Sequence, residues 1–111
     1  MTTQELQFEL MKKASFGDFH AKKVVSDLKA NTHLWDAALM DRPSLVKLRD
    51  MPEDIWNVNT LYILTGIKSD QLYELALSWN PTSIRWIEGD EADSMLGAYI
   101  SGDCILCLWW N

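Results

Sequence analysis

Hydrophobic and polar positions change their spacing along the chain, from a helical period in the first half to strand-like runs in the second. The clearest helical stripe is Ala21, Val24, Val25 and Leu28, whose side chains fall at i, i+3, i+4 and i+7. Lysines occupy several of the positions between them. This stripe predicts an amphipathic helix that begins shortly after Gly17, with one apolar face turned inward.

Further helices are predicted on either side of this one. Thr2 and Glu5 have the spacing of a capping box, which predicts a helix that runs to about Ala14. A third helix is predicted from about residue 32, and Pro43 limits it because the residue before a proline disfavours α geometry. Residues 44–50 predict one more short helix, with Leu45 and Leu48 turned inward. Residues 1–50 therefore form the helical part of the predicted domain.

After Met51-Pro52 the pattern changes to runs that are rich in strand-forming residues. The elements predicted there are strands at 56–64, 83–88 and 95–100, a helix at 69–79, and a terminal strand that begins at Cys104. The strand–helix–strand order permits a parallel pair joined by a right-handed crossover. Residues 101–103 have the length and the glycine of a hairpin connection before the terminal strand.

The terminal run from Cys104 to Trp110 is apolar without interruption. Neighbouring residues of a strand point to opposite faces, so both faces of this segment are apolar. Such a strand belongs in the middle of a sheet that is covered on both sides. The chain is therefore predicted to close around its own C-terminus.

Together these elements predict an α+β fold, with N-terminal helices followed by a β-α-β-β-β order in a small mixed sheet. Helices would cover both faces of that sheet: the N-terminal helices on one face and the 69–79 helix on the other. The length of 111 residues, 48% hydrophobic and 23% charged, fits a single domain over residues 1–111. Its helical part is 1–50 and its sheet-containing part is 55–111.

Charge is divided unevenly between the two halves. Residues 1–50 hold eight basic and seven acidic side chains, a net charge of +1, whereas residues 51–111 hold two basic and nine acidic ones, a net charge of −7. The total is the −6 of the whole chain. An acidic half of this kind should repel phosphate backbones, so no nucleic-acid partner is expected. It could attract a basic protein, or it could simply keep an apolar sheet soluble.

The run Glu88, Asp90, Glu91 and Asp93 is the strongest candidate for a binding site, predicted to lie in a loop. Hard cations prefer several oxygen ligands, but the spacing is not that of a calcium-binding loop. Three interpretations stay open for this run: a solvated loop, a patch that recognises a basic partner, and a weak metal site. No metal ligand is assigned from the sequence.

Two of the six tryptophans are candidate interface residues. Trp35 and Trp56 lie beside polar residues, and tryptophan is enriched among interface hot spots. The other four lie on apolar stripes or runs and are predicted to be core. Trp35 and Trp56 are therefore grouped with the acidic run as partner-binding candidates.

Cys104 and Cys107 have the C-x-x-C spacing of redox and metal sites. Residues three apart in a strand lie on opposite faces, so the two sulfur atoms cannot bind one ion or each other. Both thiols are predicted to be buried and inert. Free cysteines, with no signal peptide and no apolar run long enough to span a bilayer, lead us to expect a cytoplasmic protein without a membrane partner.

No assembled catalytic set is predicted. His20 and His33 each stand alone, and no motif brings a nucleophile or an acid to either of them. Lys68-Ser69 precedes a predicted helix without the glycine spacing of a phosphate-binding loop, so Ser69 is interpreted as a helix cap. No cofactor is expected.

Two classes of function remain. The leading hypothesis is a non-enzymatic protein–protein interaction domain that presents its acidic half to a basic partner, an immunity-like inhibitor in its sharpest form and a self-associating protein in its plainest. The alternative is a small-ligand or metal-binding domain, a class that includes an enzyme whose site is assembled from scattered residues.

Overall fold

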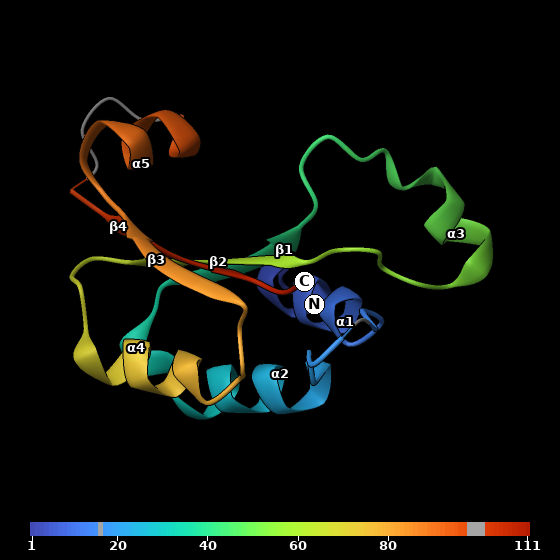
Figure 1. The fold of residues 1–111 in the computed structure, drawn as a ribbon, viewed down its shortest axis with the longest axis horizontal. Helices are drawn as coiled ribbons and strands as arrows, with labels where there is room; N and C mark the ends of the chain where they lie inside the picture. The colour runs from blue at the N-terminus through green and yellow to red at the C-terminus, as the bar shows by residue number, and fades with distance from the viewer. Residues whose placement is uncertain (16, 98–101) are drawn as a thin grey trace.

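The computed structural model describes residues 1–15, 17–97 and 102–111 (Figure 1). In these residues one sheet contains four strands in the order β1-β2-β4-β3, and every neighbouring pair is antiparallel. The strands are β1 (Ala37–Asp41), β2 (Thr60–Thr65), β3 (Ser83–Ile87) and β4 (Cys104–Trp109). The predicted α+β class is confirmed, whereas the prediction of a mixed sheet is wrong. β2 and β3 do run in the same direction, but β4 lies between them.

Helices lie on both sides of this sheet, in a different arrangement from the predicted one (Figure 1). The helices are α1 (Thr3–Met11), α2 (Ala21–Ala30), α3 (Asp50–Glu53), α4 (Asp70–Leu77) and α5 (Gly89–Leu96). α1, α2 and α4 form one layer, while α5 and α3 lie on the other side of the sheet. α4 was predicted to cover the face opposite the N-terminal helices, and instead it shares their face.

The N-terminal helices form where the sequence pattern predicts them, although α1 ends at Met11 rather than near Ala14. The hydroxyl of Thr2 accepts a hydrogen bond from the Glu5 N–H, and the Glu5 carboxylate accepts one from the Thr2 N–H, which completes the predicted capping box. In α2, Val24, Val25 and Leu28 are buried, as the stripe predicts. These helices exist because their apolar faces are covered by the sheet.

β4 occupies the centre of the sheet, which confirms the prediction from its doubly apolar sequence. The chain end is fixed as well: Trp110 is only 1% exposed, and its indole N–H donates to the Trp79 carbonyl oxygen over 3.1 Å. Phe19 meets the Trp110 ring edge-on, with centroids 4.9 Å apart. The backbone N–H of Asn111 donates to the Thr82 hydroxyl. The C-terminus is therefore part of the packed structure.

Residues 32–42 were predicted to be helical, and this prediction is wrong. Only Thr32–Leu34 form a short 3-10 turn, after which Ala37–Asp41 pair with β2 as strand β1. Ala38 and Met40 are buried and Leu39 is exposed, an alternation of period two. A stretch of four apolar residues fits either a helix or a strand, and pairing with the free side of β2 decides between them.

Four other predicted elements differ from the structure. The strand expected at 56–64 begins only at Thr60, and residues 44–50 form no more than a 3-10 turn at Lys47–Arg49 before α3. The acidic run expected to be a loop belongs to α5, which Gly97 ends in a left-handed conformation. The strand expected at 95–100 is not formed at residues 95–96, which are helical, and residues 98–100 lie outside the described residues. Ser101 of the expected hairpin lies outside them too.

Candidate interaction surface

The two faces of the sheet have different surroundings. On the face under α1, α2 and α4 many side chains are fully buried, and these include Met40, Leu61, Ile63, Leu106 and Leu108. We call this the helix-covered face. The alternate residues of the same strands point to the other side, which we call the open face: Leu39, Tyr62, Leu64, Ile105, Cys107 and Trp109. On the open face Leu39 is 48% exposed and Trp109 is 38% exposed.

α5 covers only one end of the open face. Ala92 is buried there against Ile87 and Ile105. Farther along the helix, Met95 and Leu96 are exposed, and they face Leu39, Tyr62 and Leu64 across a hollow of about 310 Å³. The lining of this hollow is almost entirely apolar. Burial raises the pKa of the Tyr62 phenol beside it.

The predicted acidic residues gather on α5 and at its N-terminal end. Glu88, Asp90 and Glu91 are exposed, and Asp93 is half-buried. Acidic side chains in the first turn are favourable because the N-terminal end of a helix carries a partial positive charge. The prediction that these residues form one acidic group is compatible with the helix, although the predicted loop is not.

The two basic residues of the second half contact this acidic group. The Lys68 ammonium lies 3.2 Å from the Glu88 carboxylate, and the Arg85 guanidinium lies 3.3 Å from the Glu91 carboxylate. The hydrogen bond to Glu91 raises the pKa of Arg85. Because all four side chains are about half-exposed, these ion pairs add little to stability. They leave the α5 region acidic.

The acidic group does not form a metal site. Among the residues that the structure describes, no group of three or more histidine, cysteine, aspartate or glutamate side chains is placed to hold a metal ion. Glu88 and Asp93 border a second hollow, of about 390 Å³, together with Asp103 and Cys104.

Trp35 and Trp56 do not join α5 in one patch. Trp35 packs edge-on against Phe8 in the helical layer, with ring centroids 5.7 Å apart, and its indole N–H donates to the Leu28 carbonyl oxygen. Trp56 follows α3, and the Lys47 ammonium lies 5.1 Å from the centre of its ring. Neither tryptophan lines the hollows beside α5. Both are half-buried, because their rings pack against the core.

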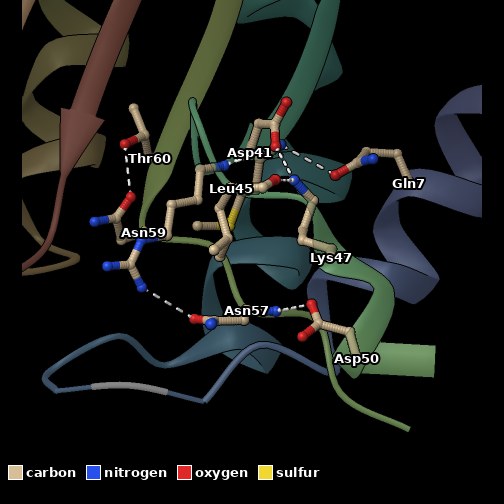
Figure 2. Close-up of polar contacts among 10 residues, drawn as sticks. Gln7, Asp41, Leu45, Lys47, Asp50, Asn57, Asn59 and Thr60 are labelled. Carbon is tan, nitrogen blue, oxygen red and sulfur yellow. Dashed lines mark hydrogen bonds and ion pairs between the residues drawn. The ribbon is translucent and has the colours of Figure 1, made fainter. Parts of the chain in front are cut away.

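The segment between β1 and β2, residues 42–59, extends from the sheet with α3 on the same side as α5 (Figure 1). Its later part contacts the chain just after α1: the Lys13 ammonium pairs with the Asp54 carboxylate, and the Lys13 carbonyl oxygen accepts a hydrogen bond from the Trp56 N–H. Polar contacts hold its two ends, as Figure 2 shows. Lys47 donates to the Asp41 carboxylate at the end of β1, and this bond lowers the pKa of Asp41. The buried carboxylate of Asp50 accepts a hydrogen bond from the Asn57 N–H over 2.7 Å, and the Asn57 side chain accepts one from Arg42.

This segment exposes large apolar side chains that sequence reasoning missed. Leu45 and Leu48 were predicted to point inward, and instead Leu48 is 74% exposed and Leu45 is exposed as well. The other exposed apolar residues are Val46, Met51 and Ile55. The sequence pointed to their exposure only through the absence of a continuous helical stripe. Apolar content alone does not show whether another segment covers a residue.

The cysteines lie on opposite faces of β4, as predicted. Cys107 pairs with Tyr62 and Arg85 on the open face, and Cys104 is on the helix-covered side. Both are half-buried rather than buried. Burial raises the pKa of the Cys107 thiol, which keeps it protonated near neutral pH.

The remaining polar candidates lie at or near helix ends. Ser69 caps α4 by accepting a hydrogen bond from the Leu72 N–H, as predicted. His20 stands immediately before α2, and His33 lies in the 3-10 turn that follows it.

No protein-family model, curated protein or solved structure matches the chain. Among the described helices, none has the length and apolar character needed to cross a lipid bilayer. The candidate surface therefore has to be interpreted from its own chemistry.

Proposed function

We propose that the protein is a non-enzymatic protein-binding domain, and that it binds its partner through the open face together with α5 and the 42–59 segment. One observation carries this proposal. Of the 13 large hydrophobic side chains exposed in the described residues, nine belong to the open face, α5 or the 42–59 segment. They form two groups, one around the hollow beside α5 and one around α3, which lie at opposite ends of the molecule (Figure 1). Exposed apolar surface with a polar rim is typical of interaction sites.

The chemistry of the surface favours a basic partner. Residues 51–111 carry a net charge of −7, and four carboxylates lie at the start of α5, the helix whose last residues line the apolar hollow. Such a field speeds the approach of a positively charged protein and fixes its orientation, whereas the apolar centre supplies most of the affinity. An inhibitor that occupies the basic groove of a nucleic-acid-handling enzyme is the sharpest form of this proposal.

The proposal is tested with matched substitutions of equal exposure. Leu96 lies beside the hollow and is 40% exposed, whereas Leu77 lies on α4 in the helical layer and is 41% exposed. Immobilised wild type, Leu96→Glu and Leu77→Glu would be exposed to a lysate of the source cells at low and at high salt. A bound protein would be identified by mass spectrometry, purified, and its affinity measured by calorimetry.

The expected result is a basic protein that binds wild type and Leu77→Glu at low salt and is weakened by salt. For Leu96→Glu we expect a loss of roughly tenfold or more in affinity, because a carboxylate would be buried in the apolar centre of the interface. Equal affinity for Leu96→Glu and wild type would refute the proposed surface. Retention of acidic proteins alone would refute the charge argument.

A further inference from the structure

The two outer edges of the sheet differ in whether their backbone N–H and C=O groups are hydrogen-bonded. Along the β1 edge, the Gln4 side chain of α1 donates to the Ala38 carbonyl oxygen and accepts from the Ala38 N–H, both over 2.8 Å. The Gln7 side chain, one turn later, accepts from the Met40 N–H over 3.0 Å. These amides take the place of a neighbouring strand, so the β1 edge offers little to another chain.

The β3 edge has no such cover in the part of the chain that the structure describes. Trp110 donates its N–H to the Asn59 carbonyl oxygen, which continues the register between β2 and β4. The backbone of Trp110 therefore faces β2. Because successive residues of a strand form hydrogen bonds to opposite neighbours, the backbone groups of residues 105, 107 and 109 face β3. They pair with residues 87, 85 and 83. The backbone N–H and C=O groups of Ile84 and Trp86 therefore point away from the sheet.

Charge does not block this edge. Natural edge strands are often protected by a charged side chain, and Arg85 stands at the centre of β3. Its guanidinium, however, is held by Glu91 of α5 over 3.3 Å on the open face. The other two central side chains, Ile84 and Trp86, are half-buried on the helix-covered side. The edge thus combines unpaired backbone groups with apolar side chains and a neutralised arginine.

We propose that β3 pairs with β3 of a second copy of this chain, antiparallel about a two-fold axis at Arg85. In this register Ile84 of each copy lies opposite Trp86 of the other copy, so the two-fold axis produces two equivalent hydrogen-bonded pairs. A β-branched residue opposite an aromatic one is a favourable cross-strand pair. Each Arg85 brings its own Glu91, so two neutral ion pairs meet at the axis rather than two bare cations.

The neighbouring symmetric registers are poorer. An axis at Trp86 places Ile84 opposite Glu88, which sets an apolar side chain against a carboxylate. An axis at Ile84 places Trp86 opposite Thr82, whose N–H already donates to the Trp109 carbonyl oxygen. Pairing at Arg85 joins the two sheets into one continuous antiparallel sheet, and the closed two-fold arrangement stops assembly at the dimer. This interface lies along the β3 edge and shares only Arg85 and Glu91 with the surface proposed for the basic partner. Mutations elsewhere on either surface therefore test the two proposals independently.

The test is the oligomeric state measured by analytical ultracentrifugation over a concentration series. Ile84→Pro removes an N–H that points outward and leaves the ladder with β4 intact. Leu39→Glu is the matched control, because it changes an exposed residue of the open face far from the β3 edge. Wild type and Leu39→Glu are expected to dimerise alike, and Ile84→Pro to dimerise roughly tenfold more weakly or not at all.

A second measurement needs no substitution and so does not depend on how Ile84→Pro folds. Amide hydrogen exchange of wild type should show Ile84 and Trp86 becoming protected as the protein concentration rises, while protection at the β1 edge stays constant. A wild-type protein that stays monomeric up to its solubility limit would overturn the proposal. So would association that Leu39→Glu weakens and Ile84→Pro does not, or edge amides that exchange at the same rate at every concentration.

Discussion

The helix-covered face and the open face of the sheet are built from alternate residues of the same strands, and they differ in how far their side chains are buried. Leu61, Ile63, Leu106 and Leu108 are fully buried under the helices, whereas Leu39 on the opposite face is half-exposed. Both faces are apolar in sequence. The comparison teaches that most of the buried core lies on one face, whereas the other face buries only a small cluster of Ile87, Ala92 and Ile105 and keeps further apolar surface in contact with solvent.

Two adjacent tryptophans give the strongest test of this comparison. Trp110 is buried between Phe19 and the Trp79 backbone, while Trp109 is 38% exposed. Trp110→Ala should lower the free energy of unfolding by about 3–5 kcal/mol, because it leaves a cavity and an unpaired carbonyl oxygen. Trp109→Ala should lower it by less than about 1 kcal/mol. Urea unfolding followed by circular dichroism measures both values.

Equal losses for the two substitutions would break the comparison, because they would show that the open face is as important for stability as the core. Trp110→Phe is a useful control for the hydrogen bond, since it keeps a ring but removes the indole N–H. The free energy of unfolding of Trp110→Phe should lie between those of wild type and Trp110→Ala.

A smaller effect is expected from a charge within the helical layer. Asp27 of α2 accepts hydrogen bonds from Lys23 and from the Trp79 indole N–H, both over 2.8 Å. The bond from Lys23 is the main reason why the pKa of Asp27 is lowered in the folded protein. A group with a lowered pKa stabilises the fold above its unfolded pKa of about 3.9, and this contribution is lost as the pH falls through the folded pKa.

Asp27→Asn should therefore lower the free energy of unfolding at pH 7 by roughly 0.5–1.5 kcal/mol. The difference from wild type should shrink as the pH falls below about 4. Denaturant unfolding at a series of pH values measures it, and Asp36→Asn, which changes an exposed carboxylate, is the control. A difference that does not change with pH would contradict the role given to the charge of Asp27.

The smallest effect expected is kinetic and concerns the open face. Burial raises the pKa of Cys107, and the carboxylate of Glu91 adds to the increase. In Cys104→Ser, alkylation of the remaining thiol by iodoacetamide should be slower than in the unfolded chain, and it should accelerate only at a higher pH than for an ordinary thiol. Adding Glu91→Gln should increase the rate slightly. A native thiol that reacts as fast as the unfolded one would show that α5 does not cover Cys107.

The success of sequence reasoning varied with the length and the periodicity of each element. The stripe of α2 and the doubly apolar terminal run predicted a helix and a central strand, and both are confirmed. Residues 37–41 were assigned to a helix because five residues cannot distinguish the two periods. α5 was missed because its acidic first turn resembles a solvated loop, although Ala92, Met95 and Leu96 have helical spacing.

The candidate surface was predicted only in part. The acidic residues at α5 are neighbours in the sequence, so their proximity needed no tertiary information. Trp35 and Trp56 were grouped with them because they lie beside polar residues. In the structure Trp35 lies in the helical layer and Trp56 follows α3, so neither lies beside α5. The exposure of Leu48 and Val46 could not be predicted, because a residue is covered or exposed according to which distant segment packs on it.

By itself the sequence determined the periods of its longer segments, the acidity of its second half and the central place of its last strand. These properties depend on residues that are close along the chain. Tertiary structure alone decided that three helices share one face, that two glutamine side chains cover the outer edge of β1, and that no described residue covers the outer edge of β3. Those outcomes depend on contacts between segments far apart in sequence, where burial of apolar surface outweighs local preference.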